Sequence, residues 1–527
     1  MAEQGGMTRR EALALLGRGA GGGALYTAMT SLGFAAESDY AGPIKLSPAP
    51  RGASILVLGA GIAGLVAAFE LRNAGYKVKV LEFNARAGGR NWTLRGGDTF
   101  TELGGATQRC EFDRGLYVNP GPWRIPYHHH GVLDYCHRLG VGLEPFVQVN
   151  HNAYLHSPRA YGGKPQRLRT VQADFHGHVA EMLAKAVNTE GLDLALTKED
   201  REKLFEALRG WGGLDGEGRY RKSFESSNRR GFATDPGGGL MREQEFSTPS
   251  DFRGLVASGL WKSLSVGDEY EFQTTIFQPV GGMDMISRAF QARVGDLITF
   301  NAKVTDIHQD DKGVTARYLD RRDNTVHTAR ADYCVCTIPL SILSQIPMNV
   351  GAAMTEAIGA VPYEGAVKVG LQFKRRFWEQ DDRIYGGITY TDLPIDRIGY
   401  PNTDYGKPGK GVLLGAYIFG PASYALTGMA PQERVRTALD QGAQIHPQYR
   451  EEFDNGIAVG WHRVPWTHGC FARWGDAQRR EHYRSLCAID GRIVLAGEHA
   501  SNLPAWQEGA VLSSLDAIQR LHRRIVA

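Results

Sequence analysis

Three glycines between an apolar strand and a helix constrain the fold more than any other feature of the chain. The apolar run from Ser54 to Leu58 predicts a buried strand, and Gly59-Ala60-Gly61-Ile62-Ala63-Gly64 follows it directly. A helix is expected from Leu65 to Ala74 and a second strand from Val78 to Glu82. This order predicts a βαβ unit of a parallel sheet, with the helix N-terminus facing the pyrophosphate of a bound dinucleotide.

Each glycine has a separate role in this unit. Gly59 makes the turn, Gly61 lets the pyrophosphate approach, and Gly64 lets the helix pack closely on the strand. Glu82 ends the second strand, where its carboxylate can accept hydrogen bonds from a ribose 2′-hydroxyl and repels the 2′-phosphate of NADP. These residues alone permit either NAD or FAD.

The residues that follow select between the two cofactors. Glu82, Arg86, Gly88, Gly89 and Arg90 resemble the E-x3-R-x-G-G-R signature of GR2-type FAD enzymes, which NAD enzymes do not carry. Arg90 can neutralise pyrophosphate, and the glycine pair permits close backbone contact. We therefore expect FAD.

Length, net charge and cysteine spacing argue against a single-domain protein, a nucleic-acid binder and a metal-binding protein. A chain of 527 residues requires more than one domain, and its formal net charge of +3 gives no indication of a nucleic-acid partner. The six cysteines form no CxxC pair, and Cys334 and Cys336 alternate in a run typical of a buried strand. His128-His129-His130 cannot easily converge on one ion, so we expect loop histidines and no metal site.

The sequence of the N-terminal segment predicts a targeting signal. Thr8-Arg9-Arg10 precedes a weakly apolar, glycine-rich stretch that reaches Ala36, which resembles a Tat export signal. A disordered tail on a cytoplasmic protein is the alternative. The signal would place the protein in the bacterial periplasm or outside, without membrane insertion, because the stretch is too weakly apolar for a transmembrane helix.

The remaining chain alternates between helical and strand patterns. Helical spacing dominates from Val132 to Leu208, and residues 209–250 indicate loops and short turns. Strands are expected around Val304, Val314, Tyr333, Val367, Val412 and Ile493, and a terminal helix from Gly509 to Ile525.

From about Ser54 to its C-terminus, the chain resembles the flavin amine oxidase family. The segments that carry this resemblance are Pro279–Asp284, Lys303-Val304, Gly365–Val369, Gly497–His499 and Trp506–Ala510. The resemblance implies an α/β fold: a Rossmann-like FAD-binding domain of the GR2 type, an inserted mixed-sheet substrate domain and a helical domain. The expected division is a Tat-like signal or tail (1–36), a linker or arm (37–52), FAD-binding segments (53–120, 273–352 and 485–527), a substrate and helical domain (121–272) and a substrate-binding domain (353–484).

One segment points to a branch of this family. Asn119-Pro120-Gly121-Pro122-Trp123-Arg124-Ile125-Pro126 is similar to the G-P-x-R-x-P of L-amino acid oxidases. In that branch the arginine, here Arg124, clamps the substrate carboxylate, which suits its planar fork. The resemblance makes Tyr417 the second clamp. The implied reaction is oxidative deamination of an L-amino acid with O2 as acceptor, giving a 2-oxo acid, ammonia and hydrogen peroxide.

The resemblance also implies roles around the flavin. Lys368 would contact flavin N5 through a water, the carbonyl of Ala505 would accept a hydrogen bond from the substrate amine, and Trp506 and Phe471 would form aromatic walls. The helix near Gly509 would direct its N-terminus at the flavin. The full set of expected cofactor contacts is Gly59, Gly61, Ile62, Ala63, Gly64, Glu82, Phe83, Arg86, Gly89, Arg90, Gly121, Pro122, Trp123, Arg124, Val304, Gly497, Glu498, Trp506, Gln507, Gly509 and Ala510.

Several alternatives stay open at this point. Gly469-Cys470-Phe471 resembles the turn that tethers FAD in monoamine oxidases, but L-amino acid oxidases generally hold FAD without a tether, so we expect non-covalent FAD. The rival functions are an amine or polyamine oxidase and a decarboxylating amino-acid monooxygenase. A third rival is a carotenoid desaturase or isomerase, or a flavoprotein that serves as a binding or assembly module. Trp506, Phe471 and Trp466 predict an apolar pocket for large neutral side chains. Members of the family often form dimers, so a homodimer is compatible with the resemblance.

Overall fold

The computed structural model describes residues 38–188 and 196–527. The twin-arginine stretch lies outside these ranges. The predicted arm begins the described part and runs in extended form beside α4 (His130–Leu139) and α17 (Gln507–Val526). Its Tyr40 hydroxyl donates a 2.6 Å hydrogen bond to Asp134 of α4. The arm is therefore fastened to the body of the protein.

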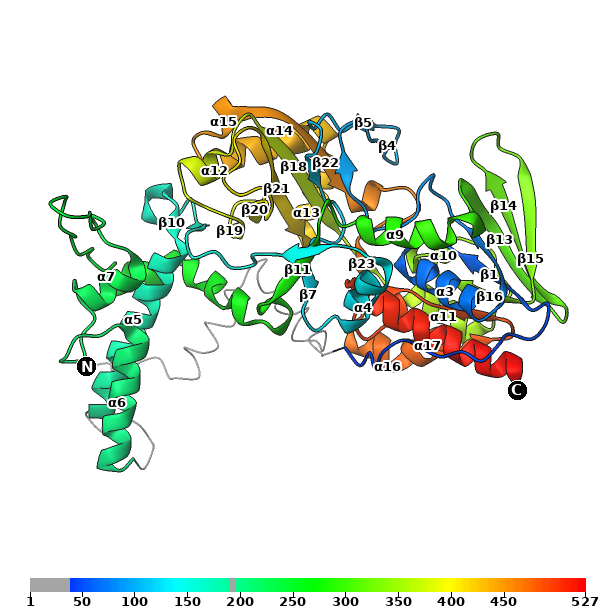
Figure 1. Ribbon diagram of the computed structural model, residues 1–527, viewed down its shortest axis with the longest axis horizontal. Coiled ribbons are helices and arrows are strands. Elements are labelled where there is room, and N and C mark those ends of the chain that lie inside the picture. Colours follow the sequence, from blue (N-terminus) through cyan, green and yellow to red (C-terminus); the bar gives the residue numbers. More distant parts are fainter. Residues whose placement is uncertain (1–37, 189–195) are drawn as a thin grey trace, which may run out of the picture.

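The sheet that carries the glycine motif is mostly parallel (Figure 1). Its strand order is β12, β2, β1, β16, β25 and β24, and only β24, at one edge, runs antiparallel to its neighbour. The bounds are β1 Ser54–Leu58, β2 Lys77–Leu81, β12 Ile298–Thr299, β16 Tyr333–Cys336, β24 Ile489–Asp490 and β25 Ile493–Leu495. Ile55 to Leu58 are fully buried, because β1 lies inside the sheet with both faces covered.

Different elements cover the two faces of this sheet. On one face pack α3 (Ile62–Asn73), α9 (Met285–Val294), α4 and α17. The other face meets a three-stranded sheet and small helices, which share one hydrophobic core with Cys334 and Cys336. The elements of this second layer are β13 Ala302–Asp310, β14 Gly313–Asp320, β15 Val326–Ala331, α10 Leu340–Leu343, α11 Ala352–Ala360 and α16 Asp476–Cys487.

A second, mixed sheet is built from strands within residues 121–272 and 353–484, the two segments predicted to contain the substrate-binding parts. Its strand order is β10, β9, β19, β20, β21, β18 and β22. The bounds are β9 Tyr154–His156, β10 Gln166–Arg167, β18 Ala366–Phe373, β19 Ile388–Thr391, β20 Arg397–Gly399, β21 Gly411–Phe419 and β22 Phe453–Gly460. The helices α13 (Gly420–Gly428) and α14 (Pro431–Gly442) lie against it. Strand β18 is buried along its whole length, including its polar residues Lys368 and Gln372.

A group of helices projects from the β9 and β10 edge of the mixed sheet, on the left of Figure 1. Its main elements are α5 (Leu168–Asn188), α6 (Lys198–Gly212), α7 (Phe224–Arg230) and α8 (Phe252–Ser258). A buried cluster that includes Ala180, Leu208 and Tyr220 holds α5 against α6. Among residues 38–188 and 196–527, no helix is long and apolar enough to cross a membrane.

Some sequence expectations were wrong in detail. Helices α4, α5 and α6 dominate the described residues from Val132 to Leu208, as predicted, but residues 143–167 also contain β8 (Leu143–Pro145), β9 and β10, which were not predicted. The expected loop at 209–250 includes α7, which a Ser223 capping box starts. The terminal helix begins at Gln507, two residues before Gly509.

Candidate active site

A single elongated pocket brings together most of the predicted site residues. It begins at the glycine motif beneath β1 and β2 and ends at the mixed sheet, near Tyr417. The predicted residues that line it are Gly59, Gly61, Ile62, Ala63, Glu82, Phe83, Gly89, Arg90, Gly121, Pro122, Trp123, Arg124, Val304, Tyr417, Phe471, Gly497, Glu498, Ala505, Trp506, Gln507 and Ala510. Gly64, Arg86, Lys368 and Gly509 were also predicted but do not line it.

The start of α3 forms one end of this pocket. Gly61 is its N-cap, and Gly61, Ile62 and Ala63 line the pocket, so the first-turn N–H groups lie where an anion can accept from them. A Cβ on Gly61 would meet no atom within 4 Å, whereas a Cβ on Gly64 would lie 1.9 Å from the carbonyl oxygen of Gly59. Gly61 therefore leaves room for a ligand, and Gly64 serves the packing of α3.

The glycine pair Gly88-Gly89 packs against the first glycine motif, at Ala60 and Gly61. Gly88 donates a backbone hydrogen bond of 2.7 Å to Ala60, and a Cβ on Gly89 would lie 3.3 Å from the Cα of Gly61. Both Gly88 and Gly89 have positive φ, which favours glycine. Arg86 lies behind the pocket and donates to the carbonyls of Ala87 and Gly89. Its predicted cofactor contact is thus indirect: it supports the loop.

Glu82 stands at the end of β2 with its carboxylate buried. The carboxylate accepts hydrogen bonds from the backbone N–H of Ala60 at 2.6 Å and of Asn84 at 2.8 Å. Burial raises the pKa of Glu82, and these hydrogen bonds and the nearby Arg86 oppose the rise. The side chain is held in the pocket wall, where the sequence places the ribose.

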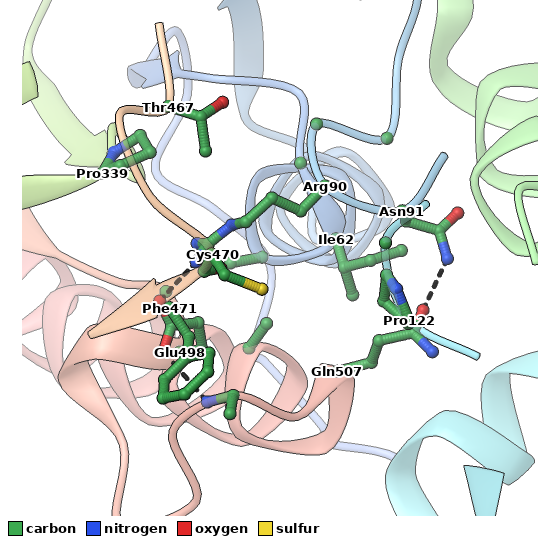
Figure 2. Close-up of a pocket in the computed structure, with 18 of the residues that line it drawn as sticks. Ile62, Arg90, Asn91, Pro122, Pro339, Thr467, Cys470, Phe471, Glu498 and Gln507 are labelled. Carbon is green, nitrogen blue, oxygen red and sulfur yellow. Dashed lines mark hydrogen bonds and ion pairs between the residues drawn. The ribbon is translucent and has the colours of Figure 1, made fainter. Parts of the chain in front are cut away.

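Arg90 links the glycine-rich segment near the N-terminus to two segments near the C-terminus, at the wall of the pocket. Its guanidinium forms a 2.6 Å ion pair with Glu498 and donates to the carbonyl of Cys470 at 2.9 Å. Figure 2 shows these side chains meeting at one side of the pocket, with the Cys470 sulfur directed toward its open centre. Glu498 also accepts from the backbone N–H groups of Ala472 and Ala505, so this cluster fixes several segments at once.

The N-terminus of α17 reaches the same space. Gln507 and Ala510 line the pocket, and Gln507 accepts a 2.6 Å hydrogen bond from Asn91, as Figure 2 shows. A Cβ on Gly509 would lie 2.0 Å from the carbonyl oxygen of Leu503, so Gly509 is needed for close packing rather than for lining the pocket. The sequence missed Asn91, which directly follows the arginine–glycine signature.

Trp466 was predicted at the substrate end of the pocket, but it lies at the other end, near Glu82. Its ring stacks on Phe83 with centroids 4.7 Å apart, beside Glu82 and Val304. The prediction of a substrate-side wall is wrong for Trp466, because the turn after residue 464 returns the chain to the Rossmann-like sheet. The Phe83 and Trp466 rings instead flank the expected adenosine end.

Arg124 is at the other end, buried among aromatic rings. Arg124 is only 4% exposed to solvent. Its guanidinium carbon lies 4.4 Å from the ring centroid of Phe272 and 6.0 Å from that of Trp506. β7 (Ile125–Pro126) pairs with β11 (Ile276–Pro279), which explains how Arg124 comes beside residues 270–272. A buried guanidinium in an apolar wall is suited to binding a carboxylate.

Tyr417 and Lys368 are neighbours across the mixed sheet. They are register partners in β21 and β18, and Lys368 Nζ lies 4.1 Å from the ring centroid of Tyr417. Lys368 Nζ also donates to the carbonyl of Gly121, within the loop that carries Arg124. Burial lowers the pKa of Lys368 to about 7; the nearby thiol of Cys470 opposes this, whereas Arg124 and Arg397 lower it further. Its contact with flavin N5 stays a prediction.

The remaining predicted side chains surround the end near Arg124. Trp506 packs against His129, with ring centroids 4.9 Å apart, and Phe471 packs against Phe419 at 6.1 Å. Ala505 has φ of 69°, a conformation rare for a residue with a Cβ, and its N–H is held by Glu498. The backbone at Ala505 is therefore fixed, as a hydrogen-bonding carbonyl requires.

Two further observations concern residues outside the expected set. His128 and His129 lie in the turn before α4, as predicted for loop histidines, whereas His130 is the first residue of α4. In the described residues, no group of three potential ligands could hold a metal ion. Glu271 belongs to no recognisable sequence motif, and it lines the pocket beside Phe272.

The pocket fits the expected FAD. An uncapped helix N-terminus with an open Gly61, a buried carboxylate at the end of β2 and an arginine beside the glycine loop are the groups that pyrophosphate and ribose require. From this end, the pocket continues to Arg124 and Trp506, where a ring system and a small substrate would meet.

Comparisons with known proteins agree with this arrangement. The family model for flavin-containing amine oxidoreductases matches residues 62–522. The flavin-dependent L-tryptophan oxidase RebO of Lentzea aerocolonigenes is 30% identical over 495 residues, which cover 89% of this chain and 97% of that protein. The putative L-amino-acid oxidase YobN of Bacillus subtilis (strain 168) is 27% identical, covering 91% and 96% respectively.

Solved structures show the same fold at lower identity. Cyclohexylamine oxidase from Brevibacterium oxydans IH-35A aligns with a TM-score of 0.59 at 16% identity, covering 90% of this chain and 100% of that one. A putrescine oxidase variant aligns with a TM-score of 0.57 at 17% identity, covering 90% and 98%. At these identities the likeness concerns the fold alone.

Proposed function

The chain belongs to the flavin-containing amine oxidoreductase family, and from this premise we propose that it oxidises L-amino acids to 2-oxo acids with non-covalent FAD. The observation that carries the proposal is the position of Arg124: a buried guanidinium at the aromatic end of the same pocket that holds the dinucleotide motif. The α-carboxylate of an amino acid is a group that this guanidinium can bind through two parallel hydrogen bonds, and a simple amine lacks it. The names of the L-amino-acid oxidases that match most of the chain support the same reaction.

The chain's own residues bind and orient the substrate. Arg124 offers two parallel N–H donors to the α-carboxylate, and the Tyr417 hydroxyl is proposed as a third donor. Because neither residue forms a covalent bond, the acceleration that they provide comes from orientation. When bound, FAD supplies the redox chemistry, accepting a hydride from the substrate Cα and passing the electrons to O2 to give hydrogen peroxide.

The aromatic surroundings set the protonation state of the substrate. The amine must be neutral when its Cα loses hydride, and the rings of Phe272, Trp506 and Phe471 exclude water from this end of the pocket. Desolvation lowers the pKa of an amine, so this environment favours the reactive form. The imino acid that forms is then hydrolysed by water to the 2-oxo acid and ammonia.

The function is tested with the purified yellow protein and a panel of all L-amino acids, each paired with its decarboxylated amine. We expect peroxide from at least one amino acid, with one 2-oxo acid and one ammonia formed per peroxide, and none from the amines. Carbon dioxide and an amide in place of the 2-oxo acid would indicate a monooxygenase. Peroxide from amines alone would identify an amine oxidase and refute the proposal.

Cys470 should not tether the cofactor. Burial raises the pKa of its thiol to about 12, so the nucleophilic thiolate is scarce even though Lys368 and Arg90 oppose the rise. Acid precipitation of the holoenzyme should release the yellow flavin into the supernatant, and Cys470→Ala should retain the same flavin content as the wild type. A yellow pellet from the wild type and a colourless one from Cys470→Ala would demonstrate a tether.

A further inference from the structure

Glu271 occupies the substrate end of the pocket, where no polar side chain other than the carboxylate clamps was expected. It lies in the short turn Tyr270–Phe272, lines the pocket and is 1% exposed. Its neighbour Phe272 packs on Arg124 and, with ring centroids 6.4 Å apart, on Trp506. Glu271 therefore belongs to the part of the pocket that would receive a substrate rather than the adenosine.

The carboxylate of Glu271 has no partner of its own. Neither oxygen takes part in a hydrogen bond with any other residue in the described part of the chain, although both are buried. Burial raises the pKa of Glu271 to about 7; its own backbone amide and Arg124 oppose the rise, and Glu269 adds to it. A buried carboxylate without partners is costly, and a bound cation would offset that cost.

The charges around Glu271 determine which cation this could be. Arg124 and Glu269 are the charged groups that act on it, and Arg124 is assigned to the substrate's α-carboxylate. Once that carboxylate binds, Arg124 is neutralised and the negative charge of Glu271 is left without compensation. A positive group on the same substrate would complete the balance.

The α-amino group is a poor candidate for this positive group. It must lose its proton before oxidation, and a carboxylate beside it would raise its pKa and hold the proton. A cation at the end of the side chain has no such requirement, and the faces of Phe272 and Trp506 would add cation–π attraction. We propose that Glu271 binds a cationic group at the end of the substrate's side chain, so that the preferred substrates are basic L-amino acids.

This inference rests on the proposed function and replaces the expectation of a large neutral side chain. That expectation came from the aromatic residues Trp506, Phe471 and Trp466. Trp466 lies elsewhere, and the aromatic rings that do line this end are equally suited to the methylene stem of a lysine or arginine.

Kinetics with matched substrates test the proposal. L-norleucine and L-citrulline are the neutral counterparts of L-lysine and L-arginine. For the wild-type holoenzyme we expect kcat/KM to favour each basic substrate over its counterpart by about 10- to 150-fold. Glu271→Gln keeps the shape but removes the charge, so it should abolish the preference while L-norleucine is still oxidised. Glu269→Gln removes the neighbouring charge, which does not line the pocket, and should keep the preference.

Binding without turnover provides a second measurement. ε-Aminocaproate and caproate differ only in the terminal amine, and neither has an α-amine to be oxidised. In equilibrium dialysis the wild type should bind ε-aminocaproate more tightly, and Glu271→Gln should bind both alike. Because the pKa of Glu271 is raised to about 7, the carboxylate loses its charge as the pH falls through that value, so the difference should shrink below it.

The outcomes separate this proposal from the proposed function. If wild type and Glu271→Gln show the same selectivity in both measurements, or if the wild type prefers L-norleucine, Glu271 is not a side-chain recognition residue. If no amino acid is oxidised at all, the proposed function fails, and the dialysis result still decides the role of Glu271.

Discussion

Replacing Arg124 with alanine should lower kcat/KM for the preferred L-amino acid by about 2–4 kcal/mol, roughly 30- to 900-fold, with FAD still bound. The residue is 4% exposed and packs on Phe272, so the variant leaves an apolar space in which a carboxylate has no cation to meet. The loss should appear mainly in KM, because the clamp binds the carboxylate in the ground state and the transition state alike.

Two controls distinguish the clamp from a structural role. Arg124→Lys keeps the charge but loses the planar fork, so its kcat/KM should fall between those of the wild type and Arg124→Ala. Flavin absorbance per protein and the melting temperature should stay close to wild type in both variants. An Arg124→Ala enzyme with the wild-type KM would mean that the carboxylate binds elsewhere, and the assignment to amino acids would lose its main support.

The parts of the fold that the sequence predicted well are those set by local patterns. The strand from Ser54 to Leu58 has the predicted bounds, and the helix after the glycines starts at Ile62 rather than Leu65. Here a continuous apolar run, a glycine turn and a largely apolar helix follow one another within about thirty residues, so that local sequence patterns are enough to identify them. The split of the cofactor pocket among distant segments was also predictable, because each segment carries its own motif.

Pairings between distant strands were not predictable in the same way. Lys368 and Tyr417 lie opposite each other because of the register in which β18 and β21 pair antiparallel, and a strand's own pattern does not identify its partner. The same limit applies to Glu271, which reaches Arg124 only through the pairing of β7 with β11. The strands within residues 143–167 were not predictable either, because strands of two or three residues are too brief to show their period of two.

The second large effect concerns FAD binding, and it is tested by making the same glycine-to-alanine change at two positions of the glycine motif. Gly61→Ala should leave the fold intact, since Gly61 has φ of −69° and its added Cβ would meet nothing within 4 Å. The same Cβ would enter the space where the pyrophosphate must approach α3, so FAD affinity should fall on the order of 100-fold. The purified variant should therefore be nearly colourless, with an apoprotein melting temperature equal to that of the wild-type apoprotein.

Gly64→Ala should give the opposite result. Its Cβ would lie 1.9 Å from the carbonyl oxygen of Gly59, so α3 must move away from β1, at a cost of about 3 kcal/mol or more. The apoprotein should melt at a lower temperature, and loss of FAD would follow from the displaced helix. Thermal melts of both apoproteins and flavin content after reconstitution measure the two effects separately. A Gly61→Ala protein that keeps its full complement of flavin would contradict the pyrophosphate site, because only a ligand lying elsewhere could tolerate that methyl group.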